Sequence, residues 1–464
     1  AWVLSVLAVQ AQGSLHSDLD LELDLDRLVA SLPPGHVHSI KVVGADSGRV
    51  MYERNASYNL LPASTVKAIT AIVAYQALGS DYRFSTRLLS HRKFTSRRVL
   101  NSDLLLSFSG DPSLTHEDLK TLLLTLRQKG VRELNGNIWL DGEVYDGYPR
   151  AGGASWDDHN ICFAAPVSAM ILDRNCFFGW LNPSNKTGRR ARMEYDEPGW
   201  LLSVDSQIIT RRPEPDEIRG CVQEVWPSSS HEYRLEGCVE PGAGPMRMAF
   251  SVSNPERAVR RFVKATLKQN GFLFKGKVLL GKPDKAFPWE VGLHFSEPLP
   301  VLLERVLEKS DNLYADSILK TIGHKVNGGK GSFFSGTEAV RAFLREEGVT
   351  LERSRLVDGS GLSRYNLASA DDFAAVLRVG WDHWKEEAPW LAGRSKKEQW
   401  LKTGFMNGVN NMVGYVFLEH REPLLFAVIL NGLRPAQPVS DEALKAFHGE
   451  IRQFQRAFLK RLSQ

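Results

Sequence analysis

The chain has 464 residues, which is too many for one ordinary hydrophobic core and favours two or three domains. With 43% hydrophobic and 24% charged residues it has the composition of a globular protein, which excludes a disordered chain. The net charge is only +4 and no long run of Lys and Arg occurs, so the composition gives no sign of a nucleic-acid-binding protein.

The first eleven residues, AWVLSVLAVQA, are mostly small and apolar. They are too few to cross a bilayer as a helix, which takes about 20 residues. Val9 and Ala11 suit the small-residue cleavage site of a secretory signal. We therefore expect residues 1–11 to be a signal-peptide remnant of an exported protein, with a buried strand or a membrane anchor as the alternative.

Helix and hairpin patterns fill the next part of the chain. The acidic stretch SDLDLELDLDRLVASL has helical spacing, and apolar residues alternate on both sides of an Asp46-Ser47-Gly48 turn, which predicts a β-hairpin. An almost wholly apolar helix is predicted to begin at Ser64 and to end at Gly79, a C-cap glycine. A helix this apolar is expected at the centre of a domain.

Residues 85–295 differ from this pattern, because short strand-like pieces alternate there with Gly and Pro turns without a fixed repeat. Four cysteines lie in this region, Cys162, Cys176, Cys221 and Cys238, and none shows C-x-x-C spacing. In an oxidising compartment the local pairs 162–176 and 221–238 are the most economical of the three connectivities. Four buried free thiols are the alternative.

Helices return after Pro300, and a second hairpin is predicted in GVNNMVGYVFLEHREPLLFAVILNG, with its turn at 420–423. A last helix is predicted to begin at Ser440, where acidic residues suit a helix N-terminus. One face of it carries Leu444, Phe447, Ile451, Phe454 and Phe458. The mixed charge of its other face favours docking on the hairpin over contact with a membrane surface.

No HExxH, phosphate-binding loop or paired C-x-x-C occurs, so no cofactor is expected. Instead, three motifs follow one another in the order S-x-x-K, S-D-N and K-T-G, as in penicillin-binding proteins and serine β-lactamases. They are Ser64-Thr65-Val66-Lys67, Ser310-Asp311-Asn312 and Lys402-Thr403-Gly404.

These residue types suit nucleophilic catalysis. Ser64 is predicted at a helix start, where free N–H groups favour developing negative charge, and Lys67 follows one turn later within reach of its hydroxyl. A partly buried lysine can accept the serine proton. Ser310 can relay that proton to the leaving amine, and Asn312 can hold Lys67 and the substrate amide. Lys402 offers a positive charge to a substrate carboxylate, beside the Thr403 hydroxyl.

Other matches to the same motifs lack the right context. Ser90–Lys93 precedes no apolar helix, Ser317–Lys320 is predicted inside a helix, and Lys186–Gly188 lies in a Pro/Asn loop with no strand after it. Only the first set combines a helix start, an interhelical loop and an edge strand.

On these motifs the chain resembles the class C low-molecular-mass penicillin-binding proteins, the D-alanyl-D-alanine carboxypeptidase/endopeptidase family of the penicillin-binding protein 4 type. The resemblance runs through nearly the whole chain. Further matching segments are Pro62-Ala63, Gly110–Thr115, Trp156–Asp158, Ala165–Ala169, Asp173–Asn175 and Asp358–Arg364.

The resemblance implies an α/β (α+β) fold, with a serine β-lactamase/DD-peptidase-like domain whose antiparallel sheet is flanked by helices. Residues 18–85 and 296–464 would form this domain, and the two hairpins would share its sheet. Ser64 and Ser310 are 246 positions apart, and this interval would carry inserted, mainly β domains. Residues 86–165 and 246–295 are expected to form one of them, and residues 166–245 the other.

The resemblance also implies the chemistry: Ser64 attacks the penultimate D-Ala carbonyl of peptidoglycan, and the N–H groups of Ser64 and Phe405 stabilise the oxyanion. Asp158 would line the cleft and pair with a substrate amino group, although a capping role is the alternative. Many relatives have Thr or Ser where this chain has Phe405, so carboxylate recognition would rest on Lys402 and Thr403.

The expected partners are peptidoglycan stem peptides and β-lactams in the periplasm, with no nucleic acid. Peripheral membrane contact and homo-oligomer formation stay open. The competing interpretations are a serine β-lactamase and a non-catalytic peptidoglycan-binding relative.

Overall fold

A computed structural model describes residues 19–93, 98–195, 203–214, 220–229, 232–384, 399–435 and 441–464. The chain forms two compact units, one made of Ala1–Val73 and Val340–Gln464 and the other of Ala74–Ala339. We call them the terminal unit and the central unit. The predicted signal remnant, residues 1–11, and Ser440 lie outside the described residues.

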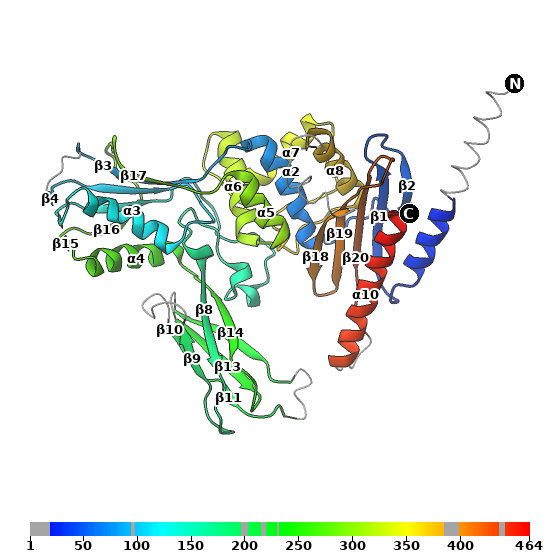
Figure 1. The fold of residues 1–464 in the computed structure, drawn as a ribbon, viewed down its shortest axis with the longest axis horizontal. Coiled ribbons are helices and arrows are strands. Elements are labelled where there is room, and N and C mark those ends of the chain that lie inside the picture. The colour runs from blue at the N-terminus through cyan, green and yellow to red at the C-terminus, as the bar shows by residue number, and fades with distance from the viewer. Residues whose placement is uncertain are drawn as a thin grey trace. The chain divides into compact units, whose positions relative to one another are not determined.

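A five-stranded antiparallel sheet forms the middle of the terminal unit, in the order β18-β19-β20-β1-β2. Its strands are β1 (Val37–Gly44), β2 (Val50–Arg54), β18 (Gln399–Met406), β19 (Val409–Val416) and β20 (Leu424–Asn431). Both predicted hairpins are confirmed. Figure 1 shows strands from opposite ends of the chain side by side, where Ile40 of β1 pairs with Val428 of β20. The prediction that the two hairpins share one sheet is therefore confirmed.

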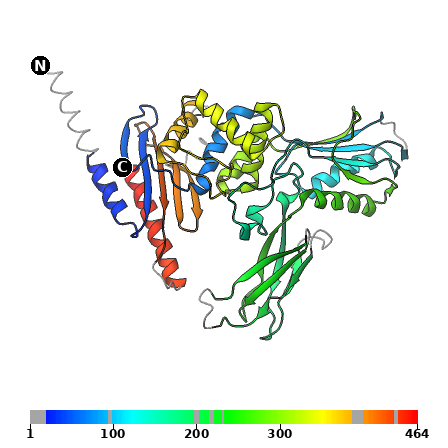
Figure 2. The same ribbon diagram turned by 180° about the vertical axis from the view of Figure 1, so that it is seen from behind.

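Helices cover both faces of this sheet, as expected for the fold class. A helix at 19–30 and α10 (Asp441–Leu462) pack on one face of the sheet. Figure 2 shows these two helices in a view of the molecule from behind. The apolar residues of α10 join the sheet core, as predicted, except that Leu444 remains 39% exposed. On the other face lies α8 (Ala370–Trp384), where the Leu377 carbonyl accepts a hydrogen bond from the Tyr415 hydroxyl of β19.

Two further helices cross the boundary between the units, because α2 (Val66–Leu78) and α7 (Phe333–Glu346) each have residues in both. The 3₁₀ turn η1 (Ala63–Thr65) leads into α2, and Gly79 follows α2 with φ 83°. The predicted helix start at Ser64 and the C-cap glycine are therefore confirmed.

The central unit contains a mixed five-stranded sheet in the order β16-β7-β5-β3-β17 and a parallel three-stranded sheet, β15-β6-β4. Helices α3 (His116–Gln128) and α4 (Pro255–Gln269) share a hydrophobic core with these sheets. Neither helix was predicted from the sequence. The strands are β3 (Ser85–Ser90), β4 (Val99–Leu100), β5 (Leu104–Phe108), β6 (Glu133–Leu134), β7 (Ile138–Asp141), β15 (Leu273–Phe274), β16 (Val278–Leu280) and β17 (Trp289–Phe295).

A second core of the central unit lies among further strands, grouped as β14-β8-β9 and as β10-β13-β11 with β12 paired to β13. They are β8 (Cys176–Asn182), β9 (Arg192–Tyr195), β10 (Ser203–Ser206), β11 (Ile209–Thr210), β12 (Gln223–Ser229), β13 (Glu232–Val239) and β14 (Met246–Ser251). Disulfides join Cys162 to Cys176 and Cys221 to Cys238, which confirms the predicted pairing. The unit is completed by α5 (Leu299–Glu308) and α6 (Asn312–Asn327).

Over the part of the chain that the structure describes, no helix is both long enough and apolar enough to cross a membrane.

Candidate active site

Ser64 lies at a turn that its neighbours hold in a strained conformation. Ala63 has φ 48°, in the left-handed region that residues with a Cβ rarely adopt. The Thr65 hydroxyl donates a hydrogen bond to the Pro62 carbonyl at 2.6 Å and so closes the turn before α2 begins. Such strain persists only where the surroundings fix it, and it concentrates at functional sites.

Lys67 lies one turn further along and is fully buried. Its Nζ donates to Ser64 Oγ at 2.9 Å and to the Ser360 carbonyl at 2.6 Å. The amine is therefore within proton-transfer distance of the hydroxyl, as general-base catalysis requires. The Ser360 carbonyl belongs to Asp358–Arg364, a segment for which the sequence shows a family resemblance but predicts no role.

The K-T-G motif lies on β18, which stands at one end of the strand order. A Cβ on Gly404 would come within 2.7 Å of the Pro62 carbonyl oxygen and 3.0 Å of the Ser64 backbone nitrogen. Real Cβ atoms do not approach backbone this closely, so a glycine is required where the strand passes the nucleophile turn.

Side chains alternate between the two faces of β18. Lys402 shares the face of Gly404, is buried, and donates to the Thr403 carbonyl at 2.8 Å. Burial lowers the pKa of the Lys402 ammonium to about 8, because a charged group loses hydration in the interior. Thr403 and Phe405 lie on the opposite face and are exposed, and the Phe405 ring lies edge-on to His448 of α10 with centroids 5.8 Å apart.

The S-D-N motif belongs to the central unit and links α5 to α6, as predicted. Ser310 has φ 53°, a second strained residue at a candidate catalytic serine. Asp311 caps α6 by accepting from the Tyr314 backbone N–H at 3.4 Å. Asn312 is the first residue of α6, and its side-chain amide donates to the Phe163 carbonyl at 2.8 Å.

Two arginines hold Asp311. Its Oδ2 lies 3.3 Å from Arg174 Nη1 and 3.2 Å from Arg305 Nε, and the carboxylate is only 10% exposed. Because Asp311 stands between Ser310 and Asn312, these ion pairs fix the backbone of the whole motif.

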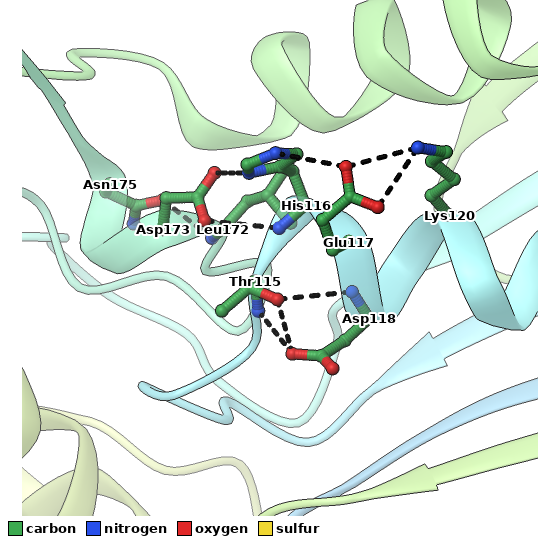
Figure 3. A network of polar contacts seen from close by, with 8 residues as sticks. All are labelled: Thr115, His116, Glu117, Asp118, Lys120, Leu172, Asp173 and Asn175. Atoms are coloured by element: carbon green, nitrogen blue, oxygen red, sulfur yellow. Dashed lines mark hydrogen bonds and ion pairs between the residues drawn. The ribbon is translucent and has the colours of Figure 1, made fainter. Parts of the chain in front are cut away.

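Arg174 belongs to a turn in which Asp173, Arg174 and Asn175 all have left-handed φ, at 48°, 60° and 48°. Figure 3 shows how this turn is tied down: Asp173 accepts from the His116 backbone N–H at 3.1 Å, and Asn175 accepts from the Leu172 N–H at 3.2 Å. The Asp173–Asn175 segment, noted in the sequence only as a family resemblance, therefore directs Arg174 toward the S-D-N motif.

Asp158 ends a 3₁₀ turn, η2 (Trp156–Asp158), and is half-buried. Its carbonyl accepts from the Ile161 N–H at 3.0 Å. Ser317 and Lys320, from one alternative motif match, are buried within α6, as predicted. Lys186–Gly188 lies in a loop after β8, also as predicted, but β9 begins at Arg192, so the expectation that no strand follows this match was wrong. Among the described residues, no group of three or more His, Cys, Asp or Glu side chains could hold a metal ion.

Known proteins match this chain over most of its length. The D-alanyl-D-alanine carboxypeptidase DacB of Haemophilus influenzae is 30% identical over 429 residues, which cover 88% of this chain and 88% of that protein. A D-alanyl-D-alanine carboxypeptidase of Actinomadura sp. is 26% identical, over 92% of this chain and 82% of that protein.

Solved structures agree with these relatives. Crystalline penicillin binding protein 4 of Haemophilus influenzae superimposes with a TM-score of 0.83 and 29% identity, over 94% of this chain and 99% of that one. The same protein complexed with a novel β-lactam gives a TM-score of 0.78 and 28% identity, with the same coverage. The profile of the D-Ala-D-Ala carboxypeptidase 3 (S13) family matches residues 21–456. The chain therefore belongs to the D-Ala-D-Ala carboxypeptidase 3 (S13) family.

Proposed function

We propose that this protein is a serine D-Ala-D-Ala carboxypeptidase/endopeptidase that cleaves peptidoglycan stem peptides and cross-links through an acyl-enzyme on Ser64. The observation that carries the proposal is the 2.9 Å contact between the buried Lys67 Nζ and Ser64 Oγ at the start of α2. Family membership supplies the reaction class.

In the proposed reaction, neutral Lys67 takes the proton of Ser64 while Oγ attacks the penultimate D-Ala carbonyl. The backbone N–H groups of Ser64 and Phe405 would stabilise the oxyanion. The C–N bond then breaks, the amine of the terminal D-Ala leaves with a proton, and an ester to Ser64 remains. Water hydrolyses this ester and restores the free serine.

The other motif residues take the roles that the motif order supports. Ser310 would pass the proton to the leaving amine, and Asn312 would bind the substrate amide. Lys402 and Thr403 would bind the terminal carboxylate, next to Gly404, and Asp158 would pair with an amino group of the stem peptide. No cofactor takes part in this scheme.

We further propose that residues 18–85 and 296–464 form the peptidase domain, with two inserted domains between them. A cell-wall substrate and two disulfides support export to the periplasm. β-Lactams should acylate Ser64, which is supported by the β-lactam complex of the Haemophilus influenzae protein.

The proposal is tested by incubating the protein with a labelled penicillin and locating the label by mass spectrometry of peptides. We expect one stable adduct on Ser64, which Ser64→Ala abolishes and Ser57→Ala, a change at an exposed serine nearby, leaves intact. A D-Ala-D-Ala pentapeptide and a cross-linked muropeptide dimer then report carboxypeptidase and endopeptidase activity separately.

Each competing function predicts a different result. A serine β-lactamase would hydrolyse the penicillin rapidly without a lasting adduct, and a non-catalytic relative would show neither label nor D-Ala release. An unlabelled wild-type protein, or an unchanged labelling yield in Ser64→Ala, would contradict the proposal.

A further inference from the structure

The loop that begins at Asp358 is organised by a buried carboxylate. Asp358 is 2% exposed and accepts three hydrogen bonds, from the Gly361 N–H at 2.7 Å, the Ser363 N–H at 2.6 Å and the Asn366 side-chain amide at 2.8 Å. A buried carboxylate with three donors fixes the backbone that supplies them. The conformation of this loop therefore depends on one side chain.

The same loop presents two backbone carbonyls to α2. The Ser360 carbonyl accepts from Lys67 Nζ at 2.6 Å, and the Gly359 carbonyl accepts from the Thr70 hydroxyl at 2.7 Å. Lys67 and Thr70 are three residues apart, so both contacts lie on one face of the helix. The loop is thus fastened to the turn of α2 that carries the general base.

Gly361 brings the loop against the nucleophile turn as well. A Cβ at this position would lie 1.8 Å from the Ala63 carbonyl oxygen and 3.1 Å from the Ser64 nitrogen, and Gly361 has φ 78°. Both the nucleophile and its base therefore contact residues of one loop, which approaches from almost 300 residues further along the chain (a separation of 293 for Lys67 and Ser360).

The Ser360 carbonyl suits an amine that must accept a proton. A neutral lysine amine has two N–H donors and one lone pair, and a carbonyl oxygen can only accept. When one N–H points at Ser360, the amine is oriented and its lone pair is available for the Ser64 proton. The ammonium that forms on proton transfer keeps the same contact.

Charge favours the same step. Burial raises the pKa of the Asp358 carboxyl, while its hydrogen bonds and the charge of Lys67 act in the opposite direction. An ionised Asp358 carboxylate would attract the ammonium that forms when Lys67 takes the proton.

We propose that Asp358 is a positioning residue for the reaction, because it holds the loop whose Ser360 carbonyl orients the Lys67 amine toward Ser64. This role rests on the proposed function of Ser64 and Lys67. It adds a residue outside the three motifs, and Thr70 acts with it by fastening the loop to α2.

The first test replaces Asp358 by Asn. The amide keeps an oxygen for Gly361 and Asn366 but turns an N–H₂ group toward the Ser363 N–H. The loop therefore loses one of the three hydrogen bonds that Asp358 accepts. Stopped-flow acylation by a chromogenic β-lactam separates the noncovalent dissociation constant from the first-order acylation constant. We expect acylation to slow by about 10- to 100-fold, with the dissociation constant unchanged within about twofold.

Asp372→Ala is the matched control. Asp372 lies at the start of α8, in the same unit, and accepts hydrogen bonds from Ser369 and Ser354. Among the described contacts it has no hydrogen bond with α2 or with the 358–364 loop. We expect this variant to melt at a lower temperature but to acylate at the wild-type rate once folded. A purely structural role for Asp358 predicts the same behaviour in both variants.

A second pair of variants keeps the test decisive if Asp358→Asn does not fold. Thr70→Val preserves shape but loses the hydroxyl that binds the Gly359 carbonyl, and Thr70→Ser retains the hydroxyl. We expect a severalfold slower acylation constant in Thr70→Val and recovery of most of the rate in Thr70→Ser.

Two results would overturn the positioning role alone: a folded Asp358→Asn protein that acylates as fast as the wild type, or a Thr70→Val protein with an unchanged rate. A wild-type protein that never becomes acylated would instead overturn the proposed function, and the positioning role with it.

Discussion

The backbone is strained at or next to both candidate catalytic serines, and the two strained positions are supported in different ways. Ala63, next to Ser64, has φ 48°, and Ser310 itself has φ 53°. Strain of this kind costs about 1–3 kcal/mol per residue and must be offset by the surroundings. Near Ser64 the support is packing against buried backbone, whereas near Ser310 it is a set of ion pairs.

The difference has physical consequences. Gly404 and Gly361 lie directly against the backbone at Pro62–Ser64, where salt has little influence. Arg174 and Arg305, which hold Asp311, are 37% and 36% exposed. Ions screen charges that water reaches much more than they affect packed atoms. The nucleophile turn should therefore respond to steric changes, and the S-D-N loop to ionic strength.

The largest effect is expected at Lys67, beside the nucleophile turn that packing supports. Lys67→Met keeps much of the volume of the lysine but removes the base that contacts Ser64 Oγ at 2.9 Å. General-base catalysis contributes about 10²- to 10⁴-fold, so acylation should slow by roughly 10³-fold. Stopped-flow acylation measures this, and circular dichroism checks that the fold is retained. A decrease of less than tenfold in the acylation rate constant would show that Lys67 is not the general base.

The close packing of Gly361 against the nucleophile turn can be tested by comparing two glycine substitutions at positions with the same φ. Gly361 and Gly348 both have φ 78°, but a Cβ would meet the Ala63 carbonyl oxygen at the first position and nothing within 4 Å at the second. Gly348→Ala should cost roughly 1–2 kcal/mol from the backbone alone. Gly361→Ala should cost more than about 3 kcal/mol because a clash is added. Urea unfolding measures both, and equal losses would refute close packing at the nucleophile turn.

Burial of Lys402, in the same motif as Gly404, also predicts a pH effect on substrate binding. The pKa of Lys402 is lowered to about 8 by burial, so the side chain is a cation below that pH and becomes neutral above it. A substrate carboxylate binds better to the cation. The dissociation constant of a D-Ala-terminated peptide should therefore rise up to tenfold per pH unit above about 8.

A peptide with a C-terminal amide provides the control for this pH effect, because it has no carboxylate to pair with Lys402. Calorimetric titration of both peptides between pH 6 and 10 distinguishes the two cases. Parallel curves for the acid and the amide would show that Lys402 does not bind the carboxylate.

The smallest effect is expected at the S-D-N loop, which ion pairs support. Arg174→Met removes one of the two arginines on Asp311, and a partly exposed pair of this kind contributes about 1 kcal/mol. Acylation should slow by about fivefold at low salt. In 0.5 M NaCl the difference from the wild type should shrink, since the pair is then screened. A salt-independent loss would show that Arg174 acts through packing.

Local patterns in the sequence predicted the elements that short-range forces fix. Both terminal hairpins, the helix start at Ser64, and the two local disulfides were predicted correctly. The apolar stripe of α10 was also placed on the correct surface. Each depends on periodicity, turn residues or proximity in the chain.

Helices α3 and α4 were missed although their signals are present. Thr115 and Asp118 form a capping box, and Asn254 caps α4 immediately before Pro255. The abundance of short strands and turns in this region obscured both signals. The local information that specifies both helices is therefore present in the sequence.

By itself, then, the sequence determined the motifs, their order and the local elements that carry them, because backbone propensity acts over a few residues. Only the tertiary structure decided that the Asp358 loop contacts Lys67 and that Phe405 turns toward His448. It also decided that Arg174 reaches Asp311 across 137 residues. Such contacts depend on which buried surfaces meet when distant segments pack, and no local pattern encodes that choice.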